Sequence, residues 1–302
     1  MVNVKQFGFA VLILAAAAII TSCSNDEVNN AGPPGKQKKT ETVAELTARL
    51  KDYGDRLGRN SAVSLQSRAN KNDNNKLTKD DWAKIAIADA KGALRGGGGF
   101  WGRTARAAVC SAIKAAKILA EKYIVAKFTA NSLPEVVITT GGKPVLADSV
   151  GYYHNLAEAV IYLRAKDCHT ISSAELLGKA SDILSTASGG RSYIGEKEMF
   201  LLEYGVDRIR SIDADNEMSF EAYCAALKAE SLAEAEHVGF LAEYIYTALY
   251  ANADMAEYTR NTLFMIENSN LGEQDTAALS GSIRIAYASM MLTQSLVLEP
   301  IK

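Results

Sequence analysis

Signals that begin helices, each followed by apolar residues at helical spacing, recur along most of this chain and limit the folds open to it. Thr42 with Glu45, and Ser172 with Glu175, have the spacing of a capping box, which satisfies the free N–H groups of a helix's first turn. Between residues 274 and 296 one apolar stripe recurs every three or four residues: Leu279, Ile283, Ala286 and Met290. The pattern predicts an all-α fold, a multi-helix bundle.

Most of the chain from residue 42 is expected to be helical. We expect helices over 42–57, 82–94 (capped by Thr78), 101–129, a segment after Asp148 that includes 150–161, 172–186, 196–211, 219–250 with a break near Gly239, 254–268 and 274–296. Residues 60–76 are rich in Asn, Lys and Ser and predict a loop, and the glycines at 96–99 must end the helix before them. The one strand-like stretch, 136–139, predicts a small β-hairpin near 136–147.

The first 22 residues have the organisation of a secretory signal. A basic start is followed by an apolar run over residues 7–20, which is shorter than the roughly 20 residues of a membrane-spanning helix. The next residues, Ile20-Thr21-Ser22-Cys23, resemble the lipobox of bacterial lipoproteins that signal peptidase II cleaves. This resemblance implies a signal peptide at 1–22 and acylation of Cys23, with fatty acids such as palmitate, whose two or three chains suffice for stable membrane anchoring.

The residues after Cys23 bear on the location of the protein. The segment 23–41 is polar and rich in Pro and Gly, so we expect the lipidated cysteine to be followed by a flexible tether. Ser24-Asn25-Asp26-Glu27 resembles the surface-export signal of Bacteroidota lipoproteins. It implies that the protein lies on the outer face of the outer membrane; without such export it would lie on the periplasmic face.

A second resemblance lies within the helical part. Gly151-Tyr152-Tyr153-His154-Asn155, together with Ile283-x-x-Ala286-x-x-Ser289, is similar to stretches of uncharacterised exported lipoproteins of gut Bacteroidota. This resemblance implies no activity. His154 and Asn155 are the polar side chains in it that we expect to take part in binding.

Charge divides the helical part into two subregions, 42–131 and 132–302. Residues 79–131 carry ten basic and four acidic side chains, whereas 132–302 carry twelve basic and twenty-four acidic ones. We expect the basic, Ala- and Gly-rich hairpin at 79–131 to pack on the acidic helices that follow. The alternative is a membrane-active, bacteriocin-like protein that places this hairpin on anionic bilayers through Lys114, Lys117 and Lys122.

Several motifs imitate reactive or ligand-binding sites and lack essential parts. The stretch 97–104 has phosphate-loop spacing but no Lys and no preceding strand, and 70–81 has calcium-loop spacing but few carboxylates. One Glu-x-x-His pair, Glu234 with His237, is too little for a di-iron site, and adjacent Cys168 and His169 do not face each other on a helix. We therefore expect no catalytic residue, metal or cofactor.

The cysteine content and the expected envelope location limit which classes of protein remain. Apart from Cys23 there are three cysteines, so at most one intramolecular disulfide can form. An envelope location removes nucleic acid as the usual partner. The sequence therefore predicts a lipid-anchored envelope protein that binds a protein or glycan ligand, with a membrane-active protein as the alternative and an enzyme as a less favoured one.

Overall fold

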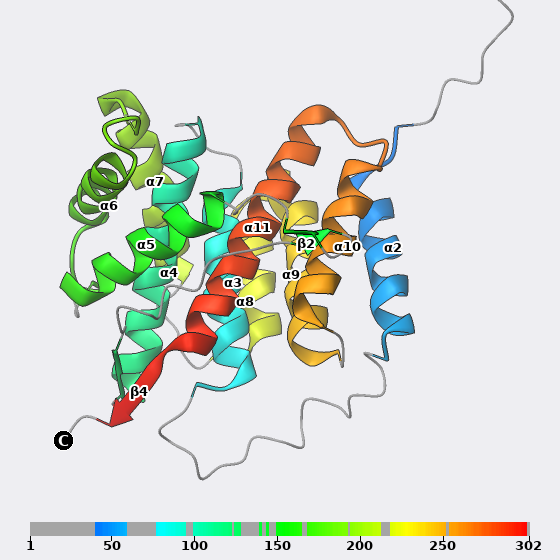
Figure 1. Cartoon of the computed structure of the whole chain (residues 1–302), viewed down its shortest axis with the longest axis horizontal. Coiled ribbons are helices and arrows are strands. Elements are labelled where there is room, and N and C mark those ends of the chain that lie inside the picture. The colour runs from blue at the N-terminus through cyan, green and yellow to red at the C-terminus, as the bar shows by residue number, and fades with distance from the viewer. Residues whose placement is uncertain are drawn as a thin grey trace, which may run out of the picture. The chain divides into compact units, whose positions relative to one another are not determined.

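The computed structural model describes residues 40–58, 77–94, 99–122, 124–127, 139–140, 143–144, 149–164, 168–192, 194–212, 218–251 and 254–300 (Figure 1). The predicted signal peptide, Cys23 and almost all of the tether lie outside these residues, as does the predicted loop at 60–76. Residues 40–302 form one unit. Within the described residues no helix is both long enough and apolar enough to cross a membrane.

The described part is a helical bundle, which confirms the predicted all-α class. Its helices are α2 (Val43–Arg56), α3 (Lys79–Ala93), α4 (Gly99–Glu121), α5 (Ser149–Arg164), α6 (Ser173–Ala187), α7 (Glu196–Ile212), α8 (Phe220–Glu230), α9 (Ala235–Tyr250), α10 (Met255–Glu267) and α11 (Glu273–Ser295), with a 3₁₀ turn, η4 (Leu232–Glu234). Short strands β1 (Ile124–Lys127), β2 (Thr139–Thr140), β3 (Lys143–Pro144) and β4 (Val297–Pro300) complete it.

The helix starts that the sequence signalled are present. Thr42 caps α2 and Thr78 caps α3, each with the reciprocal side-chain bond of a capping box, from Glu45 and Asp81. The Ser172 hydroxyl accepts the Glu175 N–H at the start of α6. These bonds satisfy N–H groups that have no partner inside the helix, so the caps fix where each helix begins.

The centre of the bundle is α3, which packs against α4, α8, α9 and α11. Figure 1 shows α3, α8 and α11 in the middle, with α5, α6 and α7 on one side and α2, α9 and α10 on the other. The apolar stripe predicted in α11 (Leu279, Ile283, Ala286, Met290) is buried. The two charge subregions therefore pack together, because α3 and α4 from the first contact α5 and α11 from the second.

The sequence placed one helix end and one break wrongly. The helix predicted to reach residue 129 ends at Glu121, and Ile124–Lys127 pairs antiparallel with Val297–Pro300 at the opposite end of the chain. The predicted hairpin is confirmed, because Thr139–Thr140 pairs with Lys143–Pro144. The helix predicted over 219–250 breaks at Ser231, directly before the 3₁₀ turn Leu232–Glu234, and Gly239 lies inside α9.

A close contact joins α3 to α4. The backbone at Gly92 lies against Ala107, and a β-carbon at position 92 would be 2.8 Å from the Ala107 Cα. The buried Arg106 guanidinium donates from Nε to the Gly92 carbonyl (2.5 Å) and from Nη2 to the Leu94 carbonyl. A cation on the last carbonyls of a helix satisfies acceptors that lack internal partners, so Arg106 holds the end of α3 against the beginning of α4.

Candidate functional site: a buried histidine–carboxylate cluster

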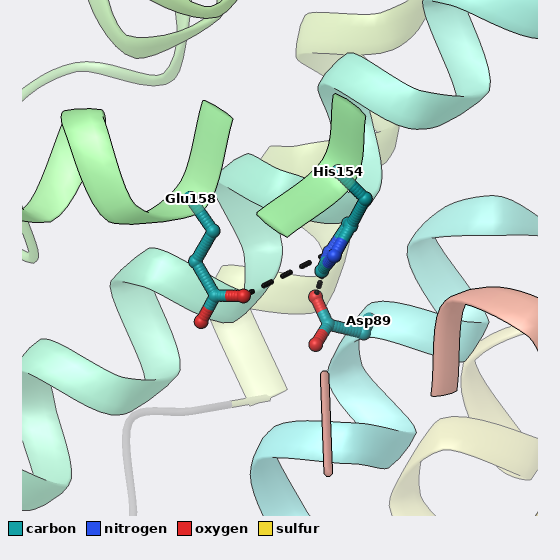
Figure 2. A group of neighbouring side chains, drawn as sticks. All are labelled: Asp89, His154 and Glu158. Atoms are coloured by element: carbon teal, nitrogen blue, oxygen red, sulfur yellow. Dashed lines mark hydrogen bonds and ion pairs between the residues drawn. The ribbon is translucent and has the colours of Figure 1, made fainter. Parts of the chain in front are cut away.

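Three ionisable side chains meet in the interior, where α3, α4, α5 and α11 pack around them. Asp89 comes from α3, whereas His154 and Glu158 lie one turn apart on α5 (Figure 2). Asp89 and His154 are fully buried, and Glu158 is 4% exposed. The imidazole Nε2 is 2.9 Å from Asp89 Oδ1 and 3.9 Å from Glu158 Oε2.

Asn155 fixes which nitrogen of His154 carries a proton. The Asn155 amide nitrogen donates to the Ala288 carbonyl on α11 (3.0 Å), so its oxygen is turned toward His154 Nδ1 at 3.0 Å. An amide oxygen only accepts, and Nδ1–H is therefore the donor of this bond. The other nitrogen, Nε2, faces the two carboxyl groups, and a proton or another positive charge must lie between it and Asp89.

Two hydroxyl groups border the carboxyl groups. The Ser111 hydroxyl on α4 donates to Glu158 Oε1 (2.5 Å). Ser111 and Ser289, the latter on α11, also lie beside the Asp89 carboxyl group. Within the described part of the chain, two buried carboxyl oxygens at this place, Asp89 Oδ2 and Glu158 Oε2, accept no hydrogen bond of ordinary geometry.

Burial and mutual charge shift all three titrations. Burial raises the pKa of Asp89, and burial together with the neighbouring Asp89 raises the pKa of Glu158 to about 8. Burial alone favours neutral imidazole, but the charge and hydrogen bond of Asp89 outweigh it and raise the pKa of His154 to about 9. An imidazolium beside one carboxylate, with the second carboxyl group protonated, makes the cluster neutral, as its burial favours.

This arrangement can hold a proton or a cation, but it is closed to an organic substrate. None of the three ionisable side chains presents a surface to solvent that a substrate could contact. The Ser111 hydroxyl is bonded to Glu158 and not to the imidazole, so the residues do not form a Ser–His–acid relay. Their ligand atoms lie within 4.8 Å of one another, a separation that a single metal ion can bridge.

The sequence singled out His154 and Asn155, and the structure places both in this cluster. It missed Asp89, Glu158 and Ser111. Two signals were available: Asp89 is the one charge in the apolar run Ile85–Ala90, and Glu158 follows His154 by four residues, which puts both on one helix face. Because both candidates are buried, neither belongs to a surface on which a macromolecule could dock.

The motifs that the sequence discounted lie apart from this cluster. Cys168 is buried and donates its S–H to the Ala112 carbonyl (3.1 Å), and Cys110, Cys168 and Cys224 form no disulfide. His237 pairs with Asp275 at 3.1 Å, while Glu234 pairs with Lys91. Gly99–Glu121 is helical and follows a helix, so Arg103 and Thr104 do not lie in a phosphate loop.

A second feature lies on the surface of α7. Phe200, Leu201 and Tyr204 are 69%, 46% and 58% exposed, and Arg208 lies over the Tyr204 ring. We refer to these four residues as the α7 face. It borders a hollow of about 220 Å³ whose lining includes Lys91, Arg106, Glu230 and Glu234.

Comparison of the chain with protein families, curated proteins and solved structures finds no match.

Proposed function

We propose that this chain is a lipid-anchored protein of the bacterial outer membrane, held through acyl chains on Cys23, which acts by binding a partner protein. The observation that carries the anchor is the order of a basic start, a short apolar run and the lipobox-like Ile20-Thr21-Ser22-Cys23. The acidic Ser24-Asn25-Asp26-Glu27 and the resemblance to exported lipoproteins of gut Bacteroidota support an outer-face location.

The α7 face is the surface that best supports a binding role. Tyr, Phe and Arg are enriched in the parts of protein interfaces that contribute most to affinity. Here two aromatic rings, a leucine and an arginine share one helix face beside a hollow. Burial of a large exposed aromatic side chain against a partner lowers the free energy relative to leaving it in water. We therefore assign the partner to this face.

The burial of α3 and α4 favours a binding protein over a membrane-active one. Lys114 is 1% exposed, with its ammonium group 4.1 Å from the centre of the Tyr223 ring. Of the other two lysines named for that alternative, Lys122 pairs with Asp81 at 2.7 Å, and Lys117 is partly exposed. Cations held in this way are not available to anionic lipid unless the bundle opens.

The anchor and its orientation can be tested together in intact cells. Wild-type protein should incorporate labelled palmitate and be digested by added protease while a periplasmic marker survives. Cys23→Ala should incorporate none, because the acceptor thiol is absent. Failure of the wild type to incorporate acyl chains would remove the anchor, and protection of acylated protein from protease would place it on the periplasmic face.

The α7 face can be tested with a photo-crosslinking amino acid at position 204. We expect a discrete adduct in living cells, which the Phe200→Ser and Leu201→Ser changes weaken by removing the neighbouring contacts. Position 264 is the matched control, because Phe264 on α10 is 66% exposed and lies on a different helix. Equal adducts at 204 and 264 would contradict the assignment, and an adduct that resists protease and yields to glycosidase would indicate a glycan partner.

A further inference from the structure

We propose that Asp89, His154 and Glu158 bind one divalent metal ion of the zinc class inside the helical bundle. Their ligand atoms (one imidazole nitrogen and one oxygen from each carboxyl group) converge from α3 and α5 within 4.8 Å of one another (Figure 2). Zn²⁺ bound at 2.0–2.2 Å in tetrahedral geometry separates its ligand atoms by about 3.4 Å. The 2.9 Å and 3.9 Å separations from Nε2 lie on either side of this value.

The orphaned oxygens are the second observation that points to a ligand. Asp89 Oδ2 and Glu158 Oε2 are buried, and neither accepts a hydrogen bond of ordinary geometry among the described residues. A buried polar atom without a partner costs about 1–3 kcal/mol, and both of these oxygens belong to carboxyl groups of the cluster. A metal ion here would give the two carboxyl groups a partner, and the Ser289 hydroxyl lies beside Asp89 as a candidate fourth ligand or as a donor to it.

The surrounding bonds resemble the outer shell that metal-binding histidines require. His154 Nδ1 donates to Asn155, whose side chain is in turn fixed on the Ala288 carbonyl, so Nε2 is the nitrogen that faces the carboxyl groups and would bind the ion in place of its proton. Ser111 orients Glu158 through Oε1 and leaves Oε2 for the ion. Such bonds set the tautomer and orientation of metal ligands.

Charge and ligand type select the ion. Two carboxylates with a neutral imidazole carry two negative charges, which a divalent cation neutralises in the buried interior. An imidazole nitrogen favours Zn²⁺ and its first-row neighbours over Ca²⁺ and Mg²⁺. Ca²⁺ needs six to eight oxygen ligands and Mg²⁺ keeps several waters, whereas this site offers two carboxyl groups and two hydroxyl groups in a fully buried setting.

Metal content is the direct test, made on the full-length protein purified in mild detergent without chelator. After refolding with Zn²⁺ we expect about one Zn²⁺ per chain, as for a site with three protein ligands. The double variant Asp89→Asn with Glu158→Gln keeps the side-chain shapes but removes both charges, and should bind Zn²⁺ at least ~10-fold more weakly. His237→Gln is the matched control: it removes a histidine 3.1 Å from one carboxylate and should retain the metal.

A second measurement keeps the proposal falsifiable if the double variant does not fold. Wild-type protein refolded with Co²⁺ and labelled with ¹⁵N-histidine should show visible bands of low-coordinate Co²⁺ and coupling of the ion to one imidazole nitrogen. His169→Gln and His237→Gln should leave both signals unchanged. Wild-type protein that binds neither Zn²⁺ nor Co²⁺ on refolding, or binds Co²⁺ without imidazole coupling, would overturn the proposal and leave a proton-held cluster.

Discussion

Replacement of His154 by leucine is expected to lower the free energy of unfolding by about 3–5 kcal/mol, because the change leaves two buried carboxyl groups without their positive partner. Asp89 is fully buried and Glu158 is 4% exposed, so neither can recover its interactions from water. The side-chain oxygen of Asn155 would also lose the hydrogen bond that it accepts from the His154 imidazole. Urea unfolding of the purified protein, followed by the far-ultraviolet circular dichroism of its helices, measures the loss.

His237→Leu is the matched control for this prediction. His237 is also buried and lies 3.1 Å from one carboxylate, but the Asp275 side chain is 29% exposed and keeps its contact with water. We expect this change to cost about 1 kcal/mol, the usual value for one partly exposed hydrogen bond. Equal losses in the two variants would mean that the cluster gains no special stability from its buried charges.

The helices could be predicted because their signals are local. Thr42 and Glu45 lie within one turn, and the cap they form depends on nothing outside that turn. By contrast, Ile124–Lys127 pairs with Val297–Pro300. The alanine-rich helix before Ile124 favours continuation of that helix, whereas the strand's partner lies 170 or more residues further along the chain. Sequence pattern carries no information on such a distant partner.

The cluster was partly predictable for the same reason. His154 and Glu158 lie four residues apart on one helix, so their neighbourhood follows from helical spacing. Asp89 is 65 residues from His154, and Ser111 is 47 residues from Glu158. Their convergence depends on how α3, α4 and α5 pack, which the helix signals do not specify. An aspartate within an apolar, alanine-rich helix was nevertheless a sign of a buried partner.

Gly92→Ala is expected to lower the free energy of unfolding by about 2–3 kcal/mol through overpacking. The new methyl group would lie 2.8 Å from the Ala107 Cα, 3.1 Å from its N and 3.3 Å from the Arg106 carbonyl. These are backbone atoms, which cannot rotate away, so α3 and α4 must separate. Separation also weakens the bond from Arg106 Nε to the Gly92 carbonyl, and a buried guanidinium that loses an acceptor adds to the cost.

Gly281→Ala provides the same chemical change without the contact. Gly281 lies inside α11, and a β-carbon there would meet nothing within 4 Å. Alanine favours a helix over glycine by about 1 kcal/mol, so this variant should be slightly more stable than the wild type. The difference between the two variants in urea unfolding therefore isolates the close approach of α3 and α4. If Gly92→Ala were as stable as Gly281→Ala, α3 and α4 could not pack backbone to backbone at Gly92.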